Sequence, residues 1–415
     1  MNRMLRELGL TAMIAAVVIV PMFGLHLDSE NGFLEISTNW FQALTFLAAA
    51  LALRATVLLS HKFPRPKIKH QAFRVFVDNP EWSVWAGRVM IVIAIALPFL
   101  PFVDRRLLDV ATLILTYVAM GWGLSIMVGM VGLLDLGYAA FYAIGAYAFS
   151  LLAVDYGWSF WAALPVVIAV CCLGALIVGG PILRLRGDYF AIVTLGFAEI
   201  VRLTLINWQS LTHGPDGVTG IPRPSVFGMA TFNMGEEGLP QFSDWLGIGH
   251  DPMQRLIFMY LLLLGFALLV MLLIGWLRRS TFGLAFEAIR EDEIAAQAMG
   301  INRPVMKLFA YVMAAIIAGI AGAFFAARQG FVSPESFNPM ESFIILSIVV
   351  LGGMGSRLGV VIAAMVLIGL PELFREFAQY RMLAFGLALV LIMIWRPQGL
   401  LAHRRPTQTL TVDKD

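Results

Sequence analysis

The chain has 415 residues, of which 60% are hydrophobic and 13% are charged, and its mean hydropathy is +0.82. Because a soluble domain carries about 25% charged residues, this composition excludes a soluble globular enzyme, a disordered chain and a secreted disulfide scaffold. It predicts a polytopic helical membrane protein. The net charge of +2 gives no reason to expect a nucleic-acid partner.

The N-terminus begins like a signal peptide, because Arg3 and Arg6 precede an apolar run. No small-x-small cleavage motif follows, since bulky residues from Leu25 to Leu27 stand where it would lie. We therefore expect the run to be retained as a first span. Residues 1–84 are predicted to form a transmembrane hairpin followed by a basic cytoplasmic connector.

Apolar runs that can cross a bilayer, for which about 20 residues are needed, follow one another along the chain. They lie at 8–25, 40–59, 85–103, 107–129, 132–153, 158–182, 188–206, 256–276 and 304–327, and shorter runs follow at 341–353, 358–371 and 382–395. Glycine-rich breaks interrupt this series at 129–137 and 352–359. We predict an all-α bundle of about ten to twelve transmembrane helices, some of them short or broken.

The two cysteines, Cys171 and Cys172, are adjacent within one apolar run. Because neighbouring side chains of a helix point about 100° apart, we interpret them as thiols that fill the core and not as a disulfide.

Lysine and arginine are concentrated in alternate connections, including 60–84, 278–303 and the tail after 396. The positive-inside rule assigns these segments to the cytoplasm, so both termini are predicted to be cytoplasmic, with 402–415 as a tail. The long loop 207–255, which contains several acidic residues, is then predicted to lie outside.

No signature of catalysis was found. The chain has no G-x-x-x-x-G-K-[ST] loop, no G-x-S-x-G elbow and no histidine pair spaced i, i+4. We therefore expect no catalytic, cofactor-binding or metal site, and no enzyme activity. A chain with many spans and no catalytic cluster moves a solute or acts as a scaffold, and transport is the favoured class.

Charged residues inside the apolar runs are candidates for function. Glu199 and Arg202 are three residues apart, so they share a helical face and can pair. They are interpreted either as a structural ion pair near the outer end of a span or as groups that line or gate a pathway. Asp135 is interpreted as a solvated or helix-capping acid. A chain of buried acids, typical of proton-coupled carriers, is not visible.

The segment 278–310 joins two spans on the predicted inner side. Ser280 or Thr281 can cap a helix. No proline or glycine occurs from 284 to 299, and Gly300 follows where a glycine ends a helix. One predicted face contains Ala285, Ile289, Ala296 and Met299, whereas the other contains Arg290, Glu291, Asp292 and Glu293. Such an amphipathic helix suits docking into a groove of a partner, or packing on its own bundle.

Several stretches resemble one known family. AAQAMG at 295–300 is similar to the cytoplasmic loop of ABC importer permeases. GLLDLGYAAFYAIGAYAFSLL at 132–152, LRLRGDYFAIVTLGFAEIVRLTL at 183–205, LTHGPDGVTGIP at 211–222, FGLAFEAIREDEIAAQAMGIN at 282–302, and LGGMGSRLG at 351–359 with RPQGLL at 396–401 resemble the LivM-type permeases of bacterial branched-chain amino-acid ABC transporters. The resemblance covers about 107–401, and the stretch before it resembles the extra N-terminal spans of the longer permease subunit.

The resemblance implies a permease core at 85–401, with a periplasmic loop at 207–255 and a cytoplasmic coupling segment at 278–303, in a bacterial inner membrane. It also implies a second homologous permease, two cytoplasmic ATPases that use ATP, and a periplasmic binding protein, while this chain itself binds no cofactor. The residues assigned to ATPase coupling are Glu287, Arg290, Glu291, Asp292, Glu293, Ala295, Ala296 and Gly300. The pathway or gating candidates are Asp135, Gly137, Glu199, Arg202, Gly353 and Gly355.

One departure concerns the glutamate of the family's cytoplasmic loop, because Ile294 precedes Ala295. Docking is therefore assigned to the whole helix. The implied cargo is leucine, isoleucine and valine, with urea or short-chain amides as the alternative. An ion-coupled secondary carrier with a site at the glycine breaks is a further alternative, and a membrane enzyme or scaffold lacks polar clusters. Dependence of transport on ATP separates an ABC importer from an ion-coupled secondary carrier.

Overall fold

The computed structural model describes residues 25–30, 33–38, 80–101, 103–183, 187–226 and 252–373, with a few isolated positions besides. Contacts divide the chain into two units, Met1–Phe76 and Val77–Asp415. The predicted spans at 8–25, 40–59 and 382–395, the connector before residue 80 and the tail at 402–415 lie outside the described residues.

The first unit contains a β-hairpin of β1 (Leu25–Glu30) and β2 (Phe33–Thr38), paired antiparallel with Leu25 opposite Thr38. The residues between the strands are Asn31 and Gly32, the dipeptide most typical of a two-residue hairpin turn. The sequence analysis, which predicted an all-α fold, included no strand here.

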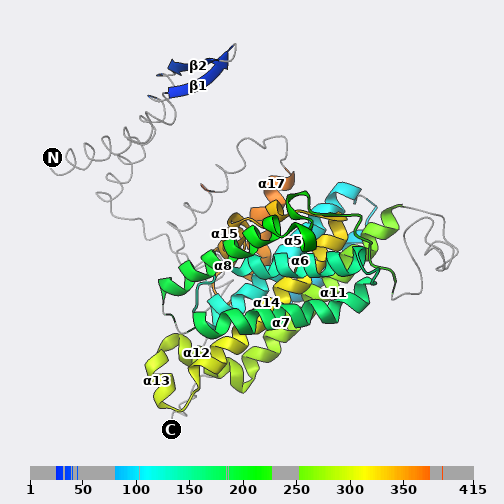
Figure 1. The fold of residues 1–415 in the computed structure, drawn as a ribbon. Coiled ribbons are helices and arrows are strands. Elements are labelled where there is room, and N and C mark those ends of the chain that lie inside the picture. The colour runs from blue at the N-terminus through cyan, green and yellow to red at the C-terminus, as the bar shows by residue number, and fades with distance from the viewer. Residues whose placement is uncertain are drawn as a thin grey trace, which may run out of the picture. The chain divides into compact units, whose positions relative to one another are not determined.

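The second unit is a helical bundle (Figure 1). Its longer helices are α4 (Pro80–Ala96), α5 (Arg105–Ser125), α6 (Tyr138–Val154), α7 (Phe160–Ile182), α8 (Asp188–Asn207), α11 (Pro252–Arg279), α14 (Arg303–Gln329) and α15 (Pro339–Gly352). Shorter elements are η2 (Leu97–Phe99), α9 (Gln209–Thr212), η4 (Gly214–Asp216), α12 (Thr281–Glu291), α13 (Glu293–Ala298), η5 (Pro334–Phe337), α16 (Arg357–Ala364) and α17 (Leu370–Leu373). The π-helical turns are η3 (Ile126–Val131) and η6 (Met365–Gly369).

Five of the described helices are long and apolar enough to cross a membrane. They are Arg105–Val131, Phe160–Ile182, Tyr189–Asn207, Met253–Arg279 and Arg303–Gln329, and shorter apolar helices lie at Trp85–Phe99, Tyr138–Val154 and Pro339–Gly352. Each of these eight helices coincides with an apolar run of the sequence.

Helix α14 lies at the centre of the bundle, packed against α6 and α7 (Figure 1). Its alanine- and glycine-rich face lets neighbouring backbones approach closely. A Cβ atom on Gly145 of α6 would lie only 2.1 Å from the carbonyl oxygen of Gly319 in α14. A second close crossing joins Gly322 to the backbone of Tyr142, again at 2.1 Å from an added Cβ atom.

A two-stranded antiparallel sheet of β3 (Val218–Thr219) and β4 (Phe331–Val332) links the segment after α8 to the segment after α14. Val218 and Val332 are both buried. This pairing fixes the two connections to each other at one end of the bundle.

Candidate functional site

Helices α12 and α13 form one end of the bundle (Figure 1). The prediction of one helix from 284 to 299 is wrong, because Asp292 has an extended backbone (φ −151°, ψ 108°) and separates the two helices. Its Oδ1 atom accepts the backbone N–H groups of Ile294 and Ala295 at 2.8 and 3.0 Å. A short acidic side chain thus competes with the helical backbone for these donors and caps a new helix.

The two backbone hydrogen bonds, first from Ala295 and then from Ile294, lower the pKa of the Asp292 carboxyl. The cap is therefore ionised at neutral pH. Ser280 occupies the cap position of α12, but its hydroxyl donates to the carbonyl oxygen of Leu277 at 2.6 Å and does not cap α12. Gly300, with φ +87°, follows α13 in the left-handed conformation that ends helices.

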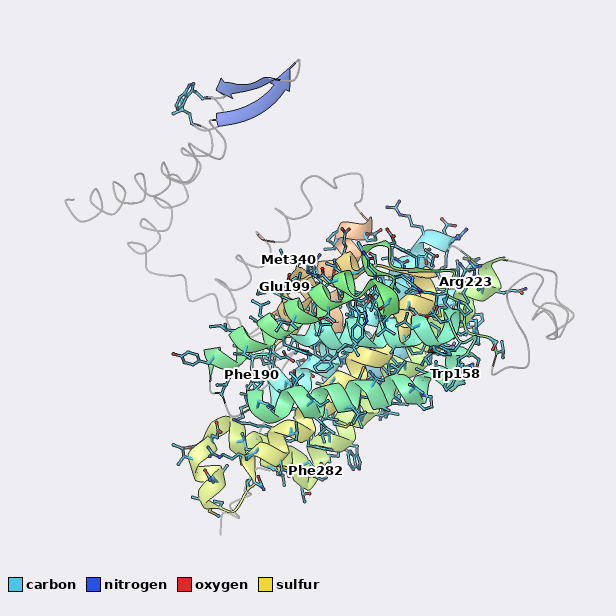
Figure 2. The ribbon with its side chains drawn as sticks, in the orientation of Figure 1. Trp158, Phe190, Glu199, Arg223, Phe282 and Met340 are labelled. Carbon is cyan, nitrogen blue, oxygen red and sulfur yellow. The ribbon has the colours of Figure 1, made fainter. Side chains whose placement is uncertain are left out.

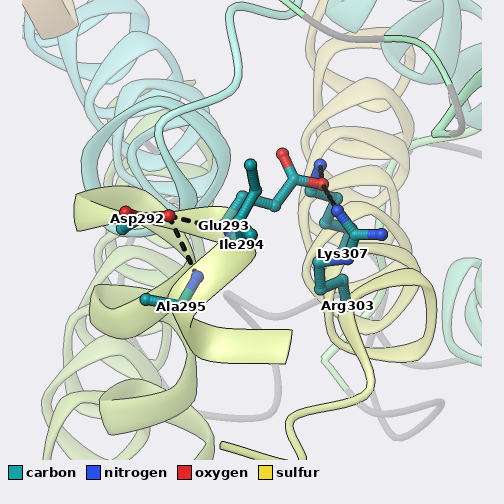
Figure 3. A network of polar contacts seen from close by, with 6 residues as sticks. All are labelled: Asp292, Glu293, Ile294, Ala295, Arg303 and Lys307. Carbon is teal, nitrogen blue, oxygen red and sulfur yellow. Dashed lines mark hydrogen bonds and ion pairs between the residues drawn. The ribbon is translucent and has the colours of Figure 1, made fainter. Parts of the chain in front are cut away.

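Helix α13 is held on the first turns of α14 by an ion-pair cluster (Figure 3). Glu293 Oε1 accepts from Lys307 Nζ at 2.8 Å and from Arg303 Nη1 at 3.1 Å. The Lys307 side chain is only 3% exposed. The acidic group assigned to a partner-facing surface therefore faces the chain's own bundle.

The break at Asp292 also changes which residues share a face. Ile289 and Ala296 are buried, as expected for the bundle side, but Met299 is 84% exposed and does not lie with them. Ile294 and Ala295 are exposed as well. The outward surface of α13 therefore consists of Ile294, Ala295 and Ala298 together with the polar Gln297. The single face predicted from continuous helical spacing does not exist.

Arg290 was predicted on the polar face with Glu291, which is exposed. Instead it points into the bundle, where its Nη1 atom donates to the carbonyl oxygen of Gly129 in η3. A Cβ atom on Gly132 would lie 3.0 Å from Arg290 Cγ. Glu287, also assigned to coupling, is half-buried on the same helix.

The first glycine-rich break lies between η3 and α6. Asp135 is 1% exposed there, and its Oδ1 atom accepts the N–H of Gly137 at 2.8 Å. The acid is therefore buried and not solvated, and it holds the turn before α6 without capping that helix, whose N-cap residue is Gly137. The N–H of Leu136 donates to Thr194 Oγ1 at 3.1 Å, and that of Ala139 to Ser342 Oγ at 3.0 Å. Side chains of α8 and α15 thus satisfy donors at the start of α6 that a helix cannot satisfy itself.

Gly137 is required by close packing. A Cβ atom there would lie 2.2 Å from the carbonyl oxygen of Thr194 in α8.

The second break, between α15 and α16, contains Gly353 and Gly355. Their φ angles of +99° and +100° favour glycine. Arg278 Nη2 donates to the carbonyl oxygen of Gly355.

Glu199 and Arg202 form the predicted ion pair on α8, in a bidentate geometry with distances of 2.5 and 3.0 Å. Their side chains are 37% and 25% exposed, so the pair does not face the interior of this bundle. Figure 2 shows Glu199 on α8, away from Phe282 at the α12 end. An open groove of about 500 Å³ lies along the end of α8, lined by Ile200, Leu203, Thr204, Asn207 and Trp208.

Several polar residues with clear roles were missed by the sequence analysis. Arg278 was counted only as part of the basic segment 278–303, and Lys307, Thr194 and Ser342 were not singled out. Tyr117 donates to Glu341 Oε2 at 2.7 Å inside the bundle. Their common signal is a polar side chain within an apolar run.

Among the described residues, no group of three or more His, Cys, Asp or Glu is placed to hold a metal ion.

Comparison with known proteins identifies the family. Residues 106–395 match the family model described as "Branched-chain amino acid transport system / permease component". The chain is 49% identical over 318 residues to the high-affinity branched-chain amino acid transport system permease protein LivM of Escherichia coli K12, covering 76% of this chain and 74% of LivM. The chain belongs to this family.

The permease has the same identity and coverage to LivM of Salmonella typhimurium. It is also 25% identical over 325 residues to the permease protein LivH of Escherichia coli K12, covering 72% of this chain and 95% of LivH. No solved structure matches it. Family membership and the apolar helices confirm the prediction of a polytopic helical membrane protein, a permease component of a branched-chain amino acid transport system.

Proposed function

We propose that this permease carries leucine, isoleucine and valine across the bacterial inner membrane as one subunit of an ATP-driven importer. The observation that carries the proposal is the 49% identity to LivM over three quarters of the chain. The name of that relative favours branched-chain amino acids over urea or short-chain amides. Both termini are proposed to be cytoplasmic, and α12 and α13 with them.

The partner that we propose within the membrane is a second, homologous permease of the LivH type. The LivM and LivH relatives are both permease proteins of the high-affinity branched-chain amino acid transport system. A pathway at the contact between two permeases requires one side of this chain that faces neither lipid nor its own core.

Helix α8 meets that requirement better than α7 or α11. The exposed side chains in the middle of α7 and α11 are apolar, for example Ile177 and Leu272, and suit acyl chains. Helix α8 exposes apolar side chains too, such as Ile192 and Ile200, but it adds the charged Glu199–Arg202 pair. A charged group in hydrocarbon is costly, about 2.5–3.5 kcal/mol on insertion scales. We therefore propose that α8 lies along the pathway, with the breaks at Asp135–Gly137 and Gly353–Gly355 as gating candidates.

The ATPases are proposed to dock on α13. The exposed side chains Ile294 and Ala295 of α13 and Met299 directly after it offer a small apolar surface. Glu291, Asp292 and Gln297 border it. This chain is proposed to bind no cofactor, ATP being used by the partner subunits. A periplasmic binding protein is proposed to deliver the amino acid at the outer side, where the acidic loop 207–255 would meet it.

Reconstitution tests the function directly. We expect proteoliposomes containing this permease, the second permease and the ATPases to accumulate leucine only with ATP and binding protein present. Uptake by this chain alone, driven by an ion gradient, would establish a secondary carrier instead.

Replacing Ala295 by glutamate tests the docking surface. We expect the ATPases to be lost on purification and uptake to fall at least about tenfold, because a charge would be buried in the contact. Ala295→Ser keeps a small side chain and should retain most of the binding. Ala296 is unsuitable for this test because it is buried in the permease itself. Normal ATPase binding by the glutamate variant would rule out docking through this face.

The Glu199–Arg202 pair is tested by charge removal. Glu199→Gln alone leaves Arg202 without its partner and should lower the yield of assembled importer or its uptake. The double variant Glu199→Gln with Arg202→Gln should restore assembly, because no unpaired charge remains. Assembly restored without uptake supports a pathway role, and restoration of both indicates a structural pair. Single variants that are silent in both assays would place the pair at the aqueous interface.

A further inference from the structure

Two arginines connect the α11–α12 end of the bundle to the two helix breaks. Arg290 of α12 donates to the carbonyl oxygen of Gly129, and Arg278 at the end of α11 donates to that of Gly355. Gly129 belongs to the last turn before η3 ends at Val131, where carbonyl groups lack partners within the helix. A cation at such a helix end is favourable both as a hydrogen-bond donor and through the helix dipole.

The two breaks also touch each other. A Cβ atom on Gly129 would lie 3.2 Å from the backbone nitrogen of Gly355. Gly132 and Arg290 are similarly close, because a Cβ atom added to Gly132 would lie 3.0 Å from Arg290 Cγ. Because packed contacts of this kind leave no free space to absorb a displacement, a shift of α12 must shift η3 and the turn at Gly355 with it.

The charges around this contact belong to one cluster. Arg278 lies near Arg290 and Arg357, with Glu287 as the neighbouring acid. Helix α12 packs on η3 and on α14, and α13 continues from it. Glu293 fixes α13 to Arg303 and Lys307. The proposed docking surface is thus held on α14 through Glu293 and is joined at Asp292 to α12, which contains Arg290.

We propose that Arg290 and Arg278 are positioning residues of the transport cycle, which transmit movement of α12 and α13 to the breaks at Gly129 and Gly355. This proposal rests on the proposed docking of ATPases at α13. It assigns to Arg290 a role inside the permease and no contact with the ATPase. Loss of the Arg290 side chain should uncouple ATP hydrolysis from uptake while the ATPases stay bound.

The test uses the complete importer in proteoliposomes, with leucine uptake and ATP hydrolysis measured in the same sample. For Arg290→Ala we expect the ATPases to co-purify and hydrolysis to continue, while leucine taken up per ATP falls roughly tenfold, as for the loss of one charged hydrogen bond. Arg290→Lys keeps a cation that reaches a single carbonyl oxygen and should recover an intermediate ratio. Arg88→Ala, which removes an exposed guanidinium from α4, should keep the original ratio.

A second readout follows the break itself. Leu134 is exposed between η3 and α6, so a Leu134→Cys chain can be labelled with a thiol reagent, and the unsubstituted chain gives the background from Cys171 and Cys172. The labelling rate should differ between the ATP-free and ATP-bound importer. Adding Arg290→Ala or Arg290→Lys should reduce or remove that difference.

Three results would overturn the proposal. An unchanged uptake-to-ATP ratio in Arg290→Ala would show that the contact transmits nothing. Loss of the ATPases from Arg290→Ala or Arg290→Lys would make Arg290 a docking residue. A labelling rate at Leu134→Cys that does not respond to ATP would show that the break does not move. Failure of the proposed function is distinct, because the unsubstituted complex would then show no ATP-dependent uptake.

Discussion

Replacing Gly145 by alanine is expected to destabilise the folded permease by about 1–3 kcal/mol or more, the cost of overpacking a tight contact. The added Cβ atom would lie 2.1 Å from the carbonyl oxygen of Gly319 and 2.3 Å from its Cα atom. Both are backbone atoms, so relief requires α6 and α14 to separate. Gly322→Ala, at 2.1 Å from the carbonyl oxygen of Tyr142, should have a similar effect.

Gly265 of α11 is the matched control. It is also a helical glycine, but an added Cβ atom there meets nothing within 4 Å. Gly265→Ala should leave stability unchanged or raise it by about 0.4–1 kcal/mol, because alanine restricts the unfolded chain. Thermal unfolding of the detergent-solubilised protein measures the stability of the Gly145→Ala and Gly265→Ala variants. Equal melting temperatures for Gly145→Ala and Gly265→Ala would contradict the close crossing of α6 and α14.

Replacing Glu293 by glutamine is expected to cost about 3 kcal/mol, because it leaves the buried ammonium of Lys307 without its counter-charge. Lys307 is 3% exposed and lies 2.8 Å from Glu293 Oε1. Lys307→Met should cost less, about 1 kcal/mol, since Glu293 keeps Arg303 at 3.1 Å. The unequal cost of the two single changes is the signature of a buried cation.

The double variant Glu293→Gln with Lys307→Met should be more stable than Glu293→Gln alone, because the buried ammonium is gone, but less stable than Lys307→Met, because Arg303, whose side chain is 19% exposed, loses Glu293. Glu291→Gln removes an exposed carboxylate at the end of α12, two residues before Glu293. It should leave the melting temperature unchanged. If Glu293→Gln melts at the temperature of Glu291→Gln, Lys307 is hydrated and the pair does not hold α13 on α14.

Local sequence signals were sufficient for the helices and for the family. Runs such as 158–182 and 304–327 are apolar over a bilayer's thickness, so their helices follow from the need to satisfy backbone hydrogen bonds without water. The i, i+3 spacing of Glu199 and Arg202 likewise required nothing beyond helical geometry. The motifs at 132–152, 282–302 and 351–359 gave the permease family that the comparison shows.

The sequence by itself therefore determined the helical membrane fold, the permease family and the local ion pair on α8. Only the tertiary structure decided that Arg290 points to Gly129, that Glu293 binds Lys307 and Arg303, and that α8 exposes its ion pair. The break at Asp292 shows why, since its carboxylate accepts two N–H groups of α13 and interrupts the helical spacing that begins in α12. Helical spacing predicts which residues share a face only while the helix is continuous, and which neighbour that face meets depends on residues distant in the sequence.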